Sequence, residues 1–204
     1  MRLSAIFFCI GFGGAAMASS AHASIVNYDA TNPAGTTIIL AAGTYQVQLI
    51  GTAAGGAYDA WDPWSGGTVS GCDGTGANCA QGWTDRFTIS FNGNTTQYLL
   101  PSSSYFSTAT QALTAYTTSP LDQQVNGGLS TPAPNPITFS LAAATPVTFG
   151  VADFPYNDNT GGVSLDVTPM TSAVPEPSTW AMLMVGFLGL VGLANRRKSR
   201  SQLA

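Results

Sequence analysis

The residues best suited to chemistry lie in one run that is closed by glycines. Asp153, Asp158 and Asn159 supply side-chain oxygens within seven residues, and Gly161 and Gly162 permit a tight turn directly after them. Ca²⁺ binds about six to eight such oxygens, from carboxylates, amides and backbone carbonyls. The run therefore predicts a calcium site at Asp153, Asp158 and Asn159. A polar hairpin whose Asp and Asn side chains cap their own backbone amides is the alternative.

The same run resembles a loop of a known lectin family. Asp153 and Pro155 are followed by Asp158, Asn159 and Gly161, and this order is similar to the Asp-x-Pro and Asn-Asn-x-Gly loop of the PA-IL-type lectins. The loop here is two residues shorter, and Asp158 stands where that family has Asn. The resemblance implies a small β-sandwich that binds carbohydrate with the help of Ca²⁺, and an exopolysaccharide would be a fitting partner.

A second run places aspartates beside tryptophans, at Asp59, Trp61, Asp62 and Trp64. Sugar-binding grooves combine these residue types, because the rings stack on C–H faces while carboxylates accept hydrogen bonds from hydroxyls. The run is therefore a second candidate for ligand binding. The alternative is that the tryptophans are buried and close one end of the fold.

The charge distribution excludes several function classes. Residues 24–172 contain nine aspartates and a single basic residue, Arg86, which leaves a net charge of −8. One cation cannot neutralise a phosphate backbone, so we expect no nucleic-acid partner. With no lysine or histidine in this range, the common catalytic triads, histidine-ligated zinc and lysine Schiff bases lack their residues. We expect a protein that is not an enzyme. Paired aspartates could still hydrolyse glycosides, so a secreted glycosidase stays an alternative.

The first 23 residues have the features of a secretory signal peptide. Arg2 provides the positive start, an apolar stretch follows, and Ala21 and Ala23 form a small-x-small cleavage site before Ser24. General secretion machinery and signal peptidase are the implied partners. Cleavage before Ser24 would leave Cys72 and Cys79 as the cysteines of the exported chain, and an oxidising compartment predicts a disulfide between them.

The last thirty residues combine a proline-flanked acidic motif, an apolar stretch and a basic end. Pro175, Glu176 and Pro177 precede an apolar stretch at 180–194, which would cover about 22 Å as a helix and so barely span a membrane. The basic end at 196–200 would stay cytoplasmic, so the domain lies on the far side.

This arrangement at residues 173–200 resembles the PEP-CTERM sorting signal of Gram-negative bacteria. The resemblance implies recognition and cleavage by a membrane-embedded exosortase. It also implies a transient anchor in the inner membrane, and then a place at the cell surface or in the extracellular matrix. The same type of tail is also labelled after ice-binding proteins. Ice binding needs a regular threonine array, and the threonine pairs of this sequence follow no period.

The segment 24–172 reads as one all-β domain, since short runs rich in Thr, Val, Ile, Tyr and Phe alternate with Gly, Asn and Pro. At least seven strands predict a β-sandwich or jelly roll. Strands are expected at 36–40, 44–50, 86–91, 95–100, 137–141, 146–151 and 163–167.

Two hairpins are expected, one between 36–40 and 44–50 and one at the Asn-Gly pair after 86–91. A short helix is expected between Tyr105 and Tyr116, because one helical face there would carry Tyr105, Ala109, Ala112, Leu113 and Tyr116. The proline-rich run 131–136 is expected to form a loop or an edge crossing. The composite expectation is an exported surface protein that binds Ca²⁺ and polysaccharide. A structural matrix protein without a ligand is the main alternative.

Overall fold

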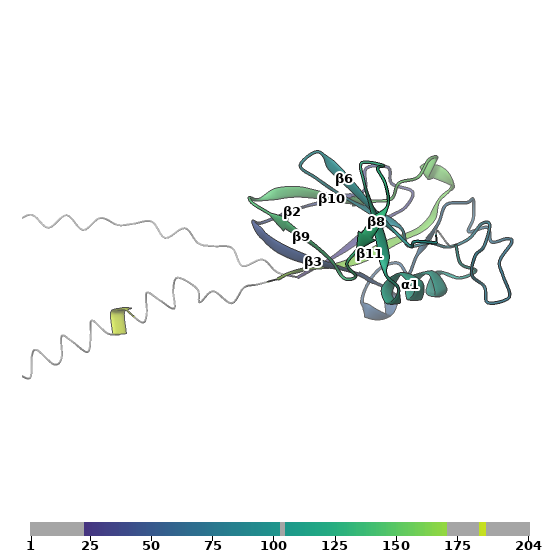
Figure 1. The fold of residues 1–204 in the computed structure, drawn as a ribbon, viewed down its shortest axis with the longest axis horizontal. Helices are drawn as coiled ribbons and strands as arrows, with labels where there is room; N and C mark the ends of the chain where they lie inside the picture. The colour runs from purple at the N-terminus through teal and green to yellow at the C-terminus, as the bar shows by residue number, and fades with distance from the viewer. Residues whose placement is uncertain (1–22, 103–104, 171–183, 187–204) are drawn as a thin grey trace, which may run out of the picture. The chain divides into compact units, whose positions relative to one another are not determined.

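The computed structural model describes residues 23–102, 105–170 and 184–186. The chain divides into two units, Met1–Pro169 and Met170–Ala204, and all described strands belong to the first. Two antiparallel sheets enclose one hydrophobic core in that unit (Figure 1). The prediction of an all-β sandwich is therefore confirmed.

Each sheet is assembled from strands that are mostly distant in sequence. The first sheet contains, in spatial order, β1 (Ser24–Asp29), β11 (Thr160–Pro169), β3 (Gly43–Ile50) and β9 (Ile137–Leu141), with β4 (Trp61–Asp62) also paired to β11. The second contains β2 (Thr36–Leu40), β10 (Thr145–Gly150), β5 (Phe87–Phe91), β6 (Asn94–Leu99), β7 (Leu121–Val125) and β8 (Thr131–Ala133).

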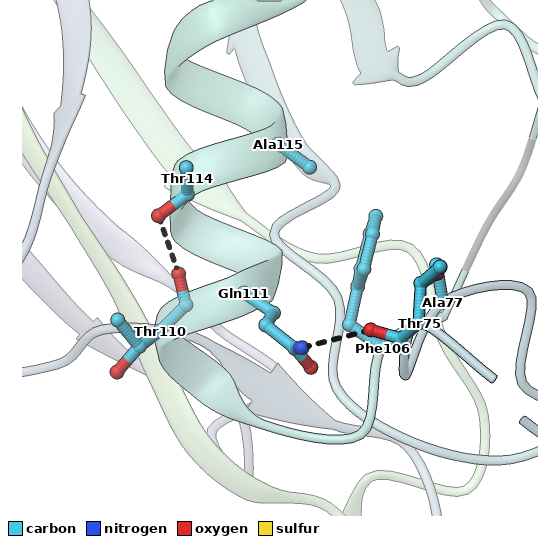
Figure 2. Close-up of a pocket in the computed structure, with 7 residues that line it drawn as sticks. All are labelled: Thr75, Ala77, Phe106, Thr110, Gln111, Thr114 and Ala115. Carbon is cyan, nitrogen blue, oxygen red and sulfur yellow. Dashed lines mark hydrogen bonds between the residues drawn. The ribbon is translucent and has the colours of Figure 1, made fainter.

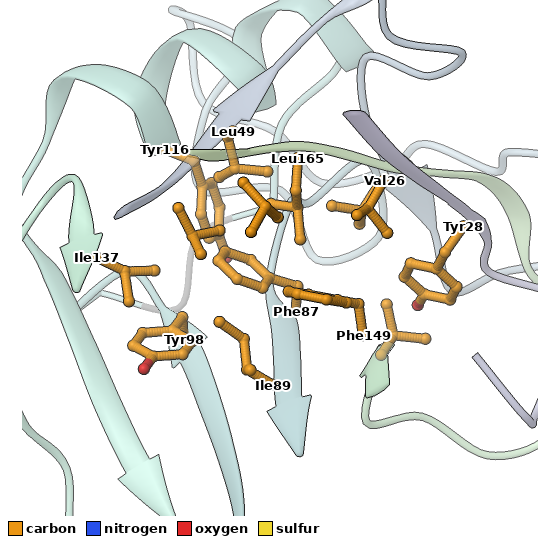
Figure 3. Close-up of a cluster of buried hydrophobic side chains, with 14 of the residues drawn as sticks. Val26, Tyr28, Leu49, Phe87, Ile89, Tyr98, Tyr116, Ile137, Phe149 and Leu165 are labelled. Atoms are coloured by element: carbon orange, nitrogen blue, oxygen red, sulfur yellow. The ribbon is translucent and has the colours of Figure 1, made fainter. Parts of the chain in front are cut away.

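Alternating side chains explain why the two sheets face each other. In β3, Tyr45, Val47 and Leu49 are buried, whereas the residues between them face outward. Phe149 and Ile89 come from the opposite sheet and join the same cluster, as Figure 3 shows. Burying each such side chain stabilises the fold by about 1.5–3 kcal/mol. The period-two pattern of the sequence therefore has a direct energetic cause.

The hairpin predicted at the Asn-Gly pair is confirmed. β5 and β6 pair antiparallel with Phe91 opposite Asn94. Asn92 and Gly93 both have positive φ, 51° and 76°, as a two-residue hairpin turn of this kind requires.

The other predicted hairpin is wrong. β2 pairs with β10 in one sheet, while β3 pairs with β9 and β11 in the other. The short link at Ala41 and Ala42 turns the chain from one sheet into the other. Each strand then buries its own apolar face, Leu40 from β2 and Tyr45 from β3, against the shared core.

The expected helix is present but begins later. α1 spans Ala109–Thr118, and the Thr108 side chain caps it by accepting a hydrogen bond from the Gln111 backbone N–H. Ala112 and Tyr116 are buried on its inner face. Tyr105 lies outside the helix, because its backbone forms a β-bridge with Cys79. Two single-turn 3₁₀ helices, η1 (Thr52–Ala54) and η2 (Tyr156–Asp158), complete the described elements of the domain.

The chain enters and leaves the domain on neighbouring strands. β1 begins at Ser24, which pairs with Val167 near the end of β11.

The first three residues of the proline-rich run form β8, which lies at the edge of the second sheet. The prediction that this run is not a central strand is therefore confirmed.

The predicted terminal segments lie largely outside the described residues. These are the signal peptide, the Pro175–Pro177 motif, the basic end at 196–200, and the apolar helix 180–194 apart from the helical residues 184–186. Among the described residues, no helix is long and apolar enough to span a membrane.

Candidate functional site

The pairing of β4 with β11 joins the two runs that the sequence singled out. Asp62 lies opposite Thr160, and Trp61 lies opposite Gly161. Gly161 has a φ of 82°, and a Cβ at this position would collide with the Ala60 carbonyl oxygen. The glycine predicted to allow a turn is therefore needed for this close approach of two backbones.

Trp61 forms the interior of this junction. Its ring is fully buried, and its Nε1–H donates to the Arg86 carbonyl oxygen at 2.9 Å. The Arg86 guanidinium lies 5.3 Å from the centroid of the Trp61 ring and 5.7 Å from that of Tyr105. Its Nη2 lies 3.7 Å from Asp153 Oδ1. Trp61 thus presents no ring face to a ligand and instead positions the cation that faces Asp153.

The loop that carries the predicted calcium ligands contains buried oxygens without partners. Asp158 ends the short helix η2, and its Oδ1 is buried with no hydrogen-bond partner among the residues that the structure describes. Asn159 is 5% exposed; its Nδ2 donates to the Ala30 carbonyl at 2.8 Å, but its Oδ1 has no partner. Buried polar atoms nearly always have partners, so unpartnered oxygens on two consecutive residues indicate a site suited to a ligand that accepts electron pairs.

Tyr28 of β1 packs near this loop. Its hydroxyl is buried and has no hydrogen-bond partner. Burial raises the pKa of this hydroxyl, and the neighbouring Tyr156 and Asp153 raise it further. Tyr28 therefore stays neutral and adds a polar oxygen to the surroundings of Asp153.

These oxygens fit a calcium ion only if several kinds of ligand contribute. Within the described part of the chain, no three His, Cys, Asp or Glu side chains are close enough to share a metal ion. The donor set would combine the carboxylates of Asp153 and Asp158, the amide oxygen of Asn159 and backbone carbonyls. That is a composition Ca²⁺ accepts.

The remaining residues of the aspartate and tryptophan run have structural contacts. Asp59 Oδ1 accepts hydrogen bonds from the Thr52 N–H at 2.7 Å and the Thr52 hydroxyl at 2.9 Å. Asp62 Oδ1 accepts from the Trp64 N–H at 2.9 Å, and burial raises the pKa of Asp62. Trp64 is half-buried with its ring edge-on to Tyr105, 4.6 Å between centroids. The four residues therefore do not line one aromatic groove.

Asp85 is a buried carboxylate that no sequence feature marked. It is 1% exposed, and neither carboxylate oxygen has a hydrogen-bond partner. Burial raises its pKa well above the usual value, and the charge of Asp59 adds to the rise. The neutral acid is thus the favoured form of Asp85 in the folded state.

The predicted disulfide between Cys72 and Cys79 is confirmed, with an S–S distance of 1.97 Å. The loop that it closes is organised by Asp73, which accepts hydrogen bonds from Thr75, Ala77 and Asn78. These bonds hold the pKa of Asp73 below its usual range, with the Thr75 hydroxyl as the largest cause.

A pocket of about 300 Å³ lies between α1 and the disulfide loop (Figure 2). Phe106, Ala77 and Ala115 contribute apolar surface to it. The Gln111 amide spans its edge, because Nε2 donates to the Thr75 carbonyl at 3.2 Å. The pocket contains no ionisable side chain and none of the predicted ligands.

A second space, also about 300 Å³, opens on the outer face of the six-stranded sheet. We call it the hydroxyl groove. Its floor consists of Thr88, Ser90, Thr95 and Thr148, from three adjacent strands. One wall is the turn at 32–35, and the other is formed by residues 150–152 and 156. We call residues 151–159, which carry the predicted calcium ligands, the calcium loop; its residues 151, 152 and 156 border this groove. Sequence reasoning missed the groove because its floor and walls come from segments that are mostly distant in sequence.

Comparison with known proteins identifies the tail. Residues 173–198 match the PEP-CTERM protein-sorting motif. The motif implies a protein that is processed by an exosortase and exported to the cell surface. No curated protein and no solved structure matches the chain, so the resemblance to PA-IL-type lectins has no support from a related sequence or structure.

Proposed function

We propose that the exported domain binds carbohydrate at the bacterial surface, without catalysis, and that Ca²⁺ held by Asp153, Asp158 and Asn159 assists this binding. Exopolysaccharide is the proposed partner. The observation that carries the proposal is the pair of buried, unpartnered oxygens, Asp158 Oδ1 and Asn159 Oδ1, in the same loop as the acidic Asp153.

A bound calcium ion would supply the missing partner of these oxygens. It would also offer open coordination positions to sugar hydroxyls. Arg86 faces Asp153 at 3.7 Å through a single contact, so its guanidinium would compete with the metal for that carboxylate. Asn159 Nδ2 donates a hydrogen bond to the Ala30 carbonyl, and this bond fixes the side-chain amide. The orientation of Asn159 Oδ1 therefore does not depend on a bound ion.

The calcium loop and the start of the sorting tail adjoin opposite ends of strand β11. The sorting tail follows β11, whose last residue is Pro169, whereas the calcium loop precedes its first residue, Thr160. A strand of ten residues covers about 30 Å. A domain held through its C-terminal tail would therefore present this loop at the end remote from the attachment point.

The arrangement of acidic residues disfavours a glycosidase. Hydrolysis needs two carboxyl groups that face each other across a sugar. The lining of the hydroxyl groove includes no acidic residue, and Asp59 and Asp73 are engaged by backbone amides. A structural matrix protein without ligand is the competing account, and it predicts no effect of calcium.

Calorimetric titration of calcium into the exported chain, purified in detergent, tests the proposal. We expect binding in the micromolar to millimolar range, lost in Asp158→Ala. Asp166→Ala is the matched control, since Asp166 lies on β11 away from the loop and accepts a hydrogen bond from the Thr168 hydroxyl. If the wild-type chain shows no heat and no calcium-dependent rise in melting temperature, the ligand-free structural role is the better account.

A further inference from the structure

Hydroxyl side chains form one continuous row across four strands of the second sheet. The strand register places Thr37 of β2 opposite Thr148 of β10, Thr148 opposite Ser90 of β5, and Ser90 opposite Thr95 of β6. Adjacent strands lie about 4.8 Å apart, so the row covers about 14 Å. Ser90 and Thr95 come from one hairpin, whereas Thr37 and Thr148 come from distant parts of the sequence, and only the register aligns them with that hairpin.

The hydroxyls are held in place by each other. Thr37 and Thr148 share a hydrogen bond of 2.8 Å, and Ser90 and Thr95 share one of 2.9 Å. Each hydroxyl has one hydrogen and two lone pairs, so a pair joined by one bond can still donate one hydrogen bond and accept others. The row thus offers both donors and acceptors in fixed positions.

Two walls turn the part of this row from Thr148 to Thr95 into the hydroxyl groove. Gly35, with a φ of 64°, packs so closely on the Phe149 carbonyl that a Cβ would collide with it, and this contact fixes the turn at 32–35 beside β10. On the other side, Tyr156 lines the groove from the calcium loop. An aromatic side chain beside hydroxyl groups suits the C–H face and the hydroxyls of a sugar ring.

The groove contains no ionised side chain, although the domain carries a net charge of −8. A polyanion such as a polyuronate would meet an unfavourable field and no cation to pair with. An uncharged polymer meets neither obstacle. The chemistry of the groove therefore selects neutral chains.

We propose that the hydroxyl groove binds an extended, uncharged polysaccharide chain that crosses the strands along the part of the row that lines the groove, over Thr148, Ser90 and Thr95. This inference rests on the proposed carbohydrate-binding function. It deepens that function by adding a site for several sugar units that contains none of the proposed calcium ligands.

Affinity electrophoresis tests the groove, with soluble galactomannan and dextran as neutral probes and alginate as the anionic one. The test variant is Ser90→Ala/Thr95→Ala. The control is Thr44→Ala/Ser140→Ala, which removes an equivalent hydroxyl pair, 2.9 Å apart, from the opposite sheet. We expect at least one neutral polysaccharide to retard the exported wild-type chain and the control. The groove variant should bind about tenfold more weakly, as the loss of two hydroxyl contacts predicts.

The outcomes separate this inference from the proposed function. If the groove variant is retarded as strongly as the control, or if alginate binds better than both neutral polymers, the groove assignment is wrong, even where calcium calorimetry supports the loop. If no neutral polysaccharide retards the wild type, the groove assignment is also wrong. Loss of retardation in the groove variant with unchanged calcium binding and melting temperature would support it.

Discussion

Arg86 is the only basic residue in residues 24–172. Replacing it with methionine tests two effects of its charge: its contribution to the free energy of unfolding and its competition with calcium for Asp153. Methionine keeps the apolar contact with Trp61 but removes the charge. The ion pair with Asp153 has one contact of 3.7 Å between partly exposed side chains, which corresponds to about 1 kcal/mol. The stacking on Trp61 and Tyr105 adds about 1 kcal/mol. Without calcium, the free energy of unfolding should therefore fall by about 2 kcal/mol, or about 4–8 °C in melting temperature.

Although Arg86→Met should lower the stability of the domain, it should increase the affinity of the domain for calcium. Asp153 would no longer be shared with a guanidinium, and the 1 kcal/mol that the metal had to overcome corresponds to about fivefold tighter binding. Calorimetry gives the affinity, and thermal melts with and without calcium give the stability. Arg86→Lys is the matched control, because it retains the charge and should not tighten calcium binding. Unchanged or weaker calcium binding in Arg86→Met would refute the competition between Arg86 and the metal.

Three further predictions concern stability. Cys72→Ser/Cys79→Ser should lower the free energy of unfolding in urea by about 2.5 kcal/mol, the chain-entropy value for a loop of eight residues, and reduction of the wild type should reproduce the loss. The pKa of Asp73 in the folded state lies below its unfolded value of about 3.9. Its contribution to the free energy of unfolding is therefore present above about pH 3.9 and is lost as the pH falls toward the folded pKa. Asp73→Asn should flatten the pH dependence of the melting temperature in that range, and an unchanged slope would contradict the hydrogen-bonded turn. The pKa of Asp85 is raised in the folded state above its unfolded value. Its contribution to the free energy of unfolding is therefore present below about pH 3.9 and is lost as the pH rises through the folded pKa. Asp85→Asn should therefore raise the melting temperature at pH 7 and leave it nearly unchanged at pH 3; a loss at pH 7 would show that the carboxylate has a partner.

Part of the candidate site was accessible from the sequence because its signals are local. Asp153, Asp158 and Asn159 lie within seven residues, so their proximity needs no knowledge of the fold. The same holds for Cys72 and Cys79, which a short loop keeps near each other. The sequence could not show which of these side-chain oxygens have hydrogen-bond partners. Whether Asn159 Oδ1 finds a donor depends on the turn after β1, where the Ala30 carbonyl accepts a hydrogen bond from the Asn159 amide nitrogen.

Other features failed as predictions because two structures share one local pattern. The runs 36–40 and 44–50 with a short link are typical of a hairpin, and they are equally typical of a corner between two sheets. The core decided between them, since both strands bury apolar side chains against it. Trp61 likewise looked suited to a sugar face, but the pairing of β4 with β11 encloses it.

The sequence by itself determined seven of the eleven described strands, the turn at Asn92 and Gly93, and the sorting tail at 173–198, because each depends on contiguous residues. Only the tertiary structure decided which strands are neighbours outside the β5–β6 hairpin, and with them the contact between Arg86 and Asp153 and the alignment of Thr37 and Thr148 with Ser90 and Thr95. The physical reason is that strand register is set by burial of the whole core. A change of one residue in register would send every side chain of a strand to the other face, and no short segment contains that information.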